Sequence, residues 1–154
     1  MMNLLRIRAE NFCQYAKLDE TLYAGLTCLL GVNGSGKSNL VRAIYLCLIG
    51  EVYGSSNLVR DGRTKGFVEL DVQTPKGEFT ITRSLKHNPK TRGTMIKHEL
   101  RATWLDQPLK KKADVAEFLA PLLGVPIPAL QHVSFALQGE FDKLMMCDHI
   151  TRVK

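Results

Sequence analysis

Apolar and polar residues alternate strictly near the start of the chain. Over residues 5–10, Leu, Ile and Ala are separated by Arg, Arg and Glu. A period of two is typical of a strand with one buried face, because successive side chains point to opposite faces of a sheet. We therefore expect a first strand here and a second, short strand over residues 18–22.

Two apolar segments flank a glycine-rich stretch. Residues 26–30 (Leu-Thr-Cys-Leu-Leu) predict a fully apolar third strand, and residues 40–49 are apolar on nearly all sides of a helix. Such a helix is expected to pack centrally. Gly50 is placed to end it, since glycine readily adopts the left-handed conformation found after helices.

The middle of the chain predicts a hairpin and a second helix. Residues 68–73 alternate, residues 74–77 (Thr-Pro-Lys-Gly) suit a turn with proline at its second position, and a return strand follows. A loop rich in Gly, Ser and charge over residues 52–65 precedes the hairpin. Residues 95–105 favour another strand, and residues 113–123 show helical spacing that Gly124 and Pro126 end.

Composition narrows the class of protein. With 154 residues, of which 45% are hydrophobic, the chain suits one domain. No apolar stretch has the length of a membrane span, and the start lacks the apolar core of a signal peptide. The four cysteines form no C-x-x-C pair, and Cys28 and Cys47 are expected to be buried thiols. We therefore expect a cytoplasmic protein without a membrane partner.

The formal charge of +6 points to an anionic partner. Much of the excess lies between Arg83 and Lys112, on a predicted strand-and-loop region. A basic surface of this kind can follow nucleic-acid phosphates, and the alternative is an ordinary solvated face. The residues expected to contact double-stranded DNA, without base specificity, are Lys86, Lys90, Arg92 and Lys97.

The stretch from Gly31 to Ser38 reads GVNGSGKS and fits the phosphate-binding pattern G-x-x-x-x-G-K-[ST] at every fixed position. Its glycines let the backbone curl so that N–H groups point at an anion, and the following helix adds the positive end of its dipole. Lys37 is expected to reach the phosphates of a nucleoside triphosphate, and the Ser38 hydroxyl to bind Mg²⁺. A plain glycine turn with a solvated lysine is the weaker interpretation, because motif and context agree.

A strand predicted over residues 133–137 ends in Gln138 and opens a helix with Phe141. Combined with the upstream phosphate loop, this segment resembles the SbcC-type ATPase subunits of DNA double-strand-break repair nucleases. These are relatives of SMC and RecF proteins among the ABC ATPases. Four stretches carry the resemblance, and together they span nearly the whole chain: LLRIRAENF, GVNGSGKSNLVRAI, FVELDVQTPKGEFTITRSL and VSFALQGEFDKLM.

The resemblance implies an α/β P-loop NTPase fold. Residues 1–140 would form the N-terminal lobe of an ABC-type ATPase head, and residues 141–154 would begin the helix that enters a coiled coil. It implies that ATP and Mg²⁺ are bound, the metal by Ser38 and Gln138. The implied partners are the C-terminal half of the same head, a second head in a homodimer, an SbcD-type nuclease and nucleoid DNA. The residues implied to bind nucleotide are Asn33, Gly34, Ser35, Gly36, Lys37, Ser38 and Asn39.

The sequence departs from the family pattern in one place and lacks two motifs. Family members often carry a basic residue after Asn-Phe that touches the phosphates, but here Cys13 follows; either the contact is missing or Arg60 or Arg63 replaces it. The chain contains neither four apolar residues followed by Asp-Glu nor the serine-glycine signature motif. We therefore expect half of a split ATPase head with no catalytic residue of its own, whose hydrolysis depends on the other half and on dimerisation.

Another class of function fits the same residues. A non-catalytic nucleotide- or DNA-binding module would use this fold for interaction alone, and the codons after Lys154 discriminate between the two. A small-molecule kinase is disfavoured, because the chain after the loop offers hairpins rather than a lid and an acceptor site.

Overall fold

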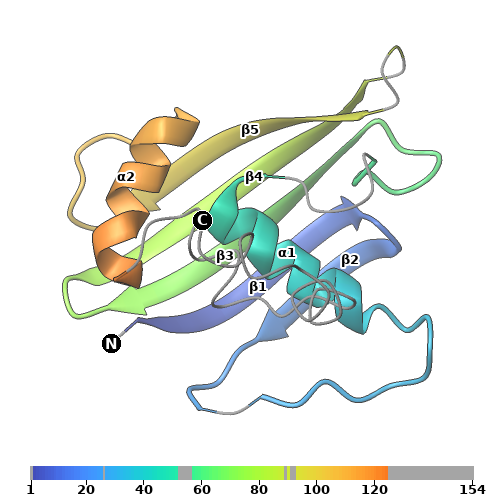
Figure 1. Cartoon of the computed structure of the whole chain (residues 1–154), viewed down its shortest axis with the longest axis horizontal. Helices are drawn as coiled ribbons and strands as arrows, with labels where there is room; N and C mark the ends of the chain where they lie inside the picture. The colour runs from blue at the N-terminus through green and yellow to red at the C-terminus, as the bar shows by residue number, and fades with distance from the viewer. Residues whose placement is uncertain (1, 26, 52–56, 89, 91–92, 125–154) are drawn as a thin grey trace, which may run out of the picture.

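The computed structural model describes residues 2–25, 27–51, 57–88, 90 and 93–124. Within these ranges the chain forms one sheet and two helices (Figure 1). The expected strand at 133–137, Gln138 and the helix after it lie outside the described residues. In chain order the elements are β1 (Asn3–Phe12), β2 (Tyr15–Thr21), α1 (Lys37–Ile49), β3 (Lys65–Thr74), β4 (Gly77–Asn88), β5 (Gly93–Ala102) and α2 (Lys112–Leu123).

The sheet has the order β2-β1-β3-β4-β5, and every neighbouring pair is antiparallel. β3 and β4 form the expected hairpin, in which Thr74 pairs with Gly77 across the turn. β1 and β3 are neighbours although the phosphate loop and α1 lie between them in sequence. The phosphate loop and α1 therefore connect β2 to β3, the two strands that flank β1 in the sheet.

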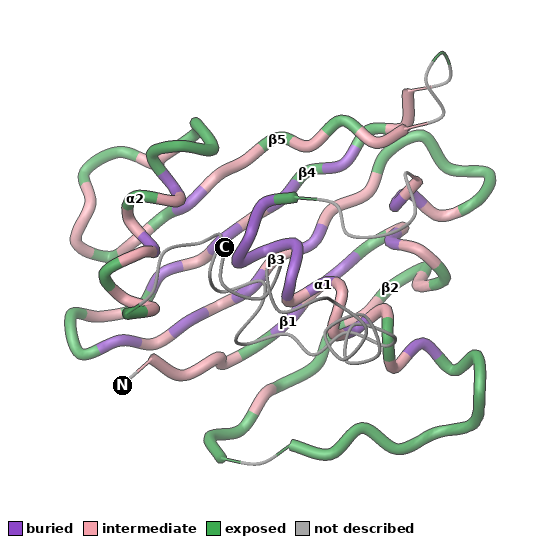
Figure 2. The backbone as a smooth tube through the Cα atoms, viewed as in Figure 1, coloured by how far each residue is buried: buried purple, intermediate pink, exposed green. Residues whose placement is uncertain are grey.

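Both helices cover the same face of the sheet (Figure 1). Figure 2 shows the buried positions alternating along the strands and becoming continuous in the second half of α1. This confirms the period-two expectation and the central helix, which Gly50 ends in the left-handed region (φ 76°). α2 packs on the end of β5, where Phe118 stacks on Trp104 and meets the edge of Phe79. Gly124 ends it, as expected.

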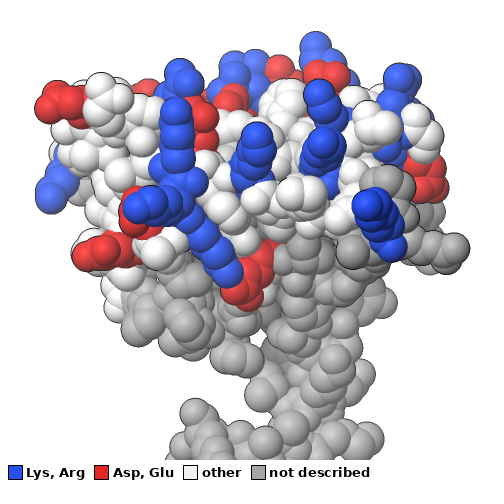
Figure 3. All heavy atoms as spheres, turned by 90° about the horizontal axis from the view of Figure 1, so that it is seen from above, with Lys and Arg blue, Asp and Glu red and all other residues white. Residues whose placement is uncertain are grey.

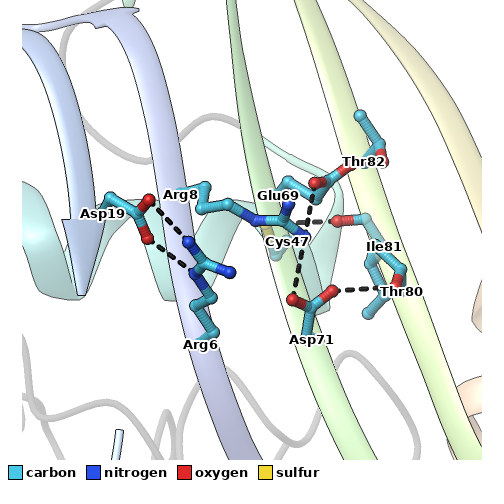
Figure 4. Close-up of polar contacts among 9 residues, drawn as sticks. All are labelled: Arg6, Arg8, Asp19, Cys47, Glu69, Asp71, Thr80, Ile81 and Thr82. Carbon is cyan, nitrogen blue, oxygen red and sulfur yellow. Dashed lines mark hydrogen bonds and ion pairs between the residues drawn. The ribbon is translucent and has the colours of Figure 1, made fainter. Parts of the chain in front are cut away.

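The opposite face of the sheet is polar and held together by cross-strand ion pairs (Figure 4). Arg6 donates two hydrogen bonds, of 2.6 and 2.7 Å, to the carboxylate of Asp19. Arg8 lies 2.8 Å from both Glu69 and Asp71. Thr80 and Thr82 donate to the same two carboxylates. An antiparallel sheet can leave one face in water, and this one does.

The prediction of an apolar strand at 26–30 is wrong for the described residues 27–30. They belong to no strand and are exposed (Figure 2). Leu30 is 87% exposed. A strand needs neighbouring backbone to satisfy its N–H and C=O groups, and none of the described strands pairs with residues 27–30. Consequently Cys28, expected to be buried, is exposed, whereas Cys47 is buried as expected.

The place of Arg83 in the sequence suggested that it belongs to a basic surface, but the structure shows that it does not. Its side chain is only 1% exposed and lies beneath the C-terminal end of α1. In the described part of the chain, no helix is long and apolar enough to span a membrane.

Candidate nucleotide-binding site

The phosphate loop borders a depression at the N-terminal end of α1. Six of the seven residues predicted to bind nucleotide line it; Ser35 belongs to the loop but not to the lining. One lining residue, Gln14 in the turn between β1 and β2, was not predicted from the sequence. The lining residues are Gln14, Asn33, Gly34, Gly36, Lys37, Ser38 and Asn39.

The start of α1 is suited to an anion. Gly36 is its N-cap residue, with φ 103°, and supplies no side chain to cap the first turn. No acidic residue lies in that turn. The first N–H groups of a helix lack intrahelical acceptors, and the dipole places about half a positive charge there. Asn39 N–H already donates to Gly36 O at 2.7 Å, so an anion in the depression would meet the N–H groups of Lys37 and Ser38 and a favourable field.

Lys37 folds back over the loop. Its Nζ donates to the carbonyl oxygens of Gly31 at 2.7 Å and Val32 at 2.8 Å. These neutral acceptors hold the ammonium group at the rim of the depression without neutralising its charge. An entering phosphate would compete for the same group, and its negative charge would make it the stronger acceptor.

The turn between β1 and β2 reaches onto the loop. Gln14 Nε2 donates to Gly34 O at 3.0 Å, and Gln14 Oε1 accepts from Asn39 Nδ2 at 2.9 Å. Tyr15 Oη donates to Gly36 O at 2.9 Å. Burial, and then the charge of Glu20, raises the pKa of Tyr15, so its hydroxyl keeps the proton that it donates.

Cys13 occupies the position where the family resemblance implies a basic residue in contact with the phosphates. Its thiol is half-buried 4.0 Å from Arg42 Nη1, and burial raises its pKa. Neither Arg60 nor Arg63 lines the depression. The backbone of Arg60 instead binds the turn, its N–H donating to Asn11 O at 2.9 Å. The structure therefore brings neither arginine to the phosphate loop, and Gln14 is the side chain that reaches it from this turn.

The residues fit a magnesium ion bound together with phosphates. Ser38 is exposed on the lip of the depression. Mg²⁺ in nucleotide sites is usually held by one or two protein oxygens, with phosphates and waters completing the octahedron. Ser38 would supply one such oxygen. Gln138, the other predicted ligand, lies outside the described residues.

Three of the lysines near the β4–β5 hairpin are exposed on the polar face or at the hairpin tip. These are Lys86, Lys90 and Lys97, and Arg92 lies outside the described residues. Lys65 on β3 is directly opposite Lys86 on β4. In the described part of the chain, Lys65, Lys86 and Lys97 form no ion pair. Figure 3 shows Lys and Arg side chains gathered along this side of the molecule.

The C-terminal end of α1 is anchored to the sheet by Arg83. Its Nη2 and Nε donate to Cys47 O at 2.6 and 3.1 Å, and its Nη1 lies 2.9 Å from His98 Nδ1. Arginine is only a donor, so His98 Nδ1 accepts and the imidazole is neutral. Burial, and then the charges of Arg83 and Lys112, lowers the pKa of His98.

Comparison with known proteins places these features in a family. The model of a family described as AAA domain matches residues 6–152. The chain is 26% identical over 149 residues to a DNA double-strand break repair Rad50 ATPase of Methanosarcina acetivorans, covering 94% of this chain and 14% of the relative. It is 30% identical over 128 residues to the DNA replication and repair protein RecF of Desulforudis audaxviator, covering 81% and 32%. The chain thus spans a third or less of these relatives.

Solved structures agree on the fold. A structure described as the recombination mediator protein RecF with ATPrS matches with a TM-score of 0.59 at 25% identity, over 75% of this chain and 30% of that one. The SMC head domain from Thermotoga maritima matches with a TM-score of 0.53 at 24% identity, over 77% and 42%. The chain therefore belongs to the AAA-domain family; it is similar in sequence to Rad50 and RecF proteins of DNA repair, and it shares its fold with an SMC head.

Proposed function

We propose that this chain binds ATP with Mg²⁺ at the loop Gly31–Ser38, as part of an SMC-like ATPase head that works in DNA repair. The observation that carries the proposal is the depression at the start of α1, which combines an uncapped helix end, Lys37 and Ser38. Those groups match a triphosphate and its metal in charge and in donor type. The resemblance to a RecF structure with a bound ATP analogue supports the choice of nucleotide.

Binding is tested by titrating the purified chain with a fluorescent ATP analogue, with and without Mg²⁺. Lys37→Ala removes a charge-assisted contact worth about 1.5–3 kcal/mol, so we expect affinity to fall roughly tenfold to more than a hundredfold. The matched control is Lys76→Ala, since Lys76 is exposed in the β3–β4 turn away from the depression. Equal loss in both variants, or no effect of Lys37→Ala, would contradict the proposal.

Hydrolysis, in this proposal, requires the C-terminal half of the head and a second head. Phosphoryl transfer depends on charges positioned around the γ-phosphate, and the described site supplies a phosphate cradle and one lysine. The exposed apolar segment that precedes the loop supports a missing structural partner. Leu30 and Val32 are 87% and 78% exposed, and an adjacent hollow is lined by apolar residues of this segment and α1, including Leu29, Leu40 and Ile44.

DNA is the proposed macromolecular ligand, contacted by Lys86, Lys90, Arg92 and Lys97. The specific observation is the facing pair Lys65 and Lys86, because like charges directly opposite in a sheet repel, and a polyanion would relieve the repulsion. By the SbcC resemblance, we extend the proposal to control of an SbcD-type nuclease or tethering of DNA ends. An ATP-responsive nuclease that co-purifies with the tagged protein would support that extension.

The salt dependence of duplex DNA binding tests the basic surface. If Lys86 and Lys97 each contact a phosphate, Lys86→Gln/Lys97→Gln lowers the slope of log K against log salt by about 1.8. The control Lys76→Gln/Lys111→Gln removes the same charge elsewhere and should leave the slope nearly unchanged. Identical slopes for both double variants would exclude this surface.

A further inference from the structure

The turn between β1 and β2 is held in an unusual backbone conformation. Asn11 and Cys13, both non-glycine residues, have φ 49°. Such left-handed residues cost on the order of 1 kcal/mol or more and persist only where the surroundings fix them. Here the segment after α1 does so: Cys13 N–H donates to Leu58 O at 2.8 Å, and Phe12 bridges to Val59. The turn is therefore a rigid platform beside the phosphate loop.

Gln14 and Tyr15 project from this platform onto the loop. The amide of Gln14 is used at both ends, donating to Gly34 O and accepting from Asn39 Nδ2. This arrangement fixes which end of the amide is nitrogen, because only that orientation satisfies both partners. The turn lies so close that a Cβ on Gly36 would be 2.3 Å from Gln14 Nε2 and 2.6 Å from Tyr15 Oη.

These bonds determine where the loop's N–H groups point. A peptide unit is planar and trans, so its N–H points away from its C=O. Holding Gly34 O sets the direction of the Ser35 N–H, and holding Gly36 O sets that of the Lys37 N–H. Lys37 N–H is one of the first-turn donors that a phosphate would use.

We propose that Gln14, assisted by Tyr15, is a positioning residue that orders the phosphate loop before nucleotide arrives. The inference rests on the proposed nucleotide-binding function and adds a residue to it. Ordering the loop in advance removes part of the conformational entropy that binding would otherwise cost. It also ties the loop to the antiparallel sheet through β1 and β2.

The test is Gln14→Met, which keeps the length of the side chain and removes both hydrogen bonds. The matched control is Gln73→Met, because Gln73 lies on β3 opposite Asn3, at the other end of β1 from the turn. In the titration with the ATP analogue and Mg²⁺, we expect Gln14→Met to weaken affinity about tenfold, as the loss of two ordinary hydrogen bonds implies. Gln73→Met should stay within twofold.

Two further readouts separate positioning from general stability. The urea midpoint of Gln14→Met should match that of Gln73→Met, while amide hydrogen exchange at residues 31–39 of the nucleotide-free chain should become several-fold faster only in Gln14→Met. Combining Gln14→Met with Asn39→Ala should weaken binding by less than the product of the two single effects, since the two side chains share one bond.

The outcomes keep this inference distinct from the proposed function. If Gln14→Met binds like the parent chain while Lys37→Ala has lost affinity, the positioning role is overturned and the nucleotide site stands. If the parent chain does not bind the analogue, the proposed function fails, and the hydrogen-exchange comparison still decides whether Gln14 orders the loop. Unchanged exchange at residues 31–39 overturns the inference in either case.

Discussion

Replacing Arg83 tests how the phosphate-loop helix is fixed to the sheet. α1 has no basic residue in its last turn, so the buried guanidinium of Arg83, reaching across from β4, supplies the cation at its C-terminal end. It also satisfies Cys47 O, one of the last carbonyls of the helix, which have no intrahelical partner. In the described part of the chain no carboxylate pairs with Arg83. Burial lowers the pKa of Arg83, because the charged guanidinium loses hydration.

The magnitude follows from opposing terms. Hydrogen bonds from a charged donor contribute about 1.5–3 kcal/mol, and a cation at a partly buried helix end contributes up to about 2 kcal/mol. Removing the guanidinium also removes its desolvation cost, which offsets part of that sum. We expect Arg83→Met to lower the free energy of unfolding by about 2 kcal/mol. Arg83→Ala, which adds a cavity, should lower it by about 3–4 kcal/mol.

Urea unfolding followed by the fluorescence of Trp104, the one tryptophan, measures both variants. A loss of about 2 kcal/mol corresponds to a fall in Tm of about 4–8 °C for a chain of this size. Arg101→Met is the control, since the Arg101 side chain is 74% exposed on β5 and its loss should cost less than about 0.5 kcal/mol. If Arg83→Met is as stable as the parent, desolvation outweighs the bonds, and Arg83 does not anchor the helix.

Two other predictions concern groups on either side of this helix. The pKa of His98 is held below its ordinary value of 6.5, so the folded chain binds fewer protons than the unfolded chain between the two values, and stability falls as pH drops through that window. His98→Gln, which keeps an acceptor for Arg83, should lose less stability than the parent between pH 8 and pH 5 in urea titrations, and an equal loss would refute the assignment. In a Cys13→Ser/Cys147→Ser background, Cys28 should react first with a thiol reagent and Cys47, buried with a pKa raised to about 12, only on unfolding; a missing fast phase, or one that survives Cys28→Ser, would contradict the exposure of Cys28.

Local pattern was sufficient for most of the fold. The alternation in β1, β3 and β4 and the turn at Thr74–Gly77 are properties of neighbouring residues, and the structure confirms them. The phosphate-loop motif is likewise a local pattern, because its glycines and lysine lie within eight residues, and its role in nucleotide binding stays a prediction. The prediction of a strand at 26–30 failed because a strand also needs neighbouring strands, and no strand of the described sheet pairs with residues 27–30. Hydrophobicity predicts that a segment seeks burial, but not which backbone will cover it.

Gln14, Arg83 and Gly66 show what sequence patterns leave out. Gln14 acts on a loop 20 residues away, and Arg83 on a carbonyl 36 residues away. A Cβ on Gly66 would lie 2.6 Å from the backbone oxygens of Glu10 and Asn11. The close approach of β1 therefore requires glycine at this position of β3. In each case the residue type is ordinary and its partner is fixed only by the tertiary fold. One usable signal was the pair of polar residues, Gln14 and Tyr15, at the connection between the first two strands.

The two ends of α1 are held to neighbouring elements by side-chain hydrogen bonds, whereas the segment that enters the loop is exposed. At its start the helix and loop are held through Gln14 in the β1–β2 turn and Tyr15 on β2, and at its end through Arg83 on β4. Residues 27–32, by contrast, are exposed and in no strand. Lys37 holds only the end of this segment, through Gly31 O and Val32 O, so a force applied at the phosphate site would move residues 27–30 more readily than the helix. Under the proposed function, a partner that covered Leu30 and Val32 would therefore respond to nucleotide binding before the sheet, which is tied to α1 through Arg83.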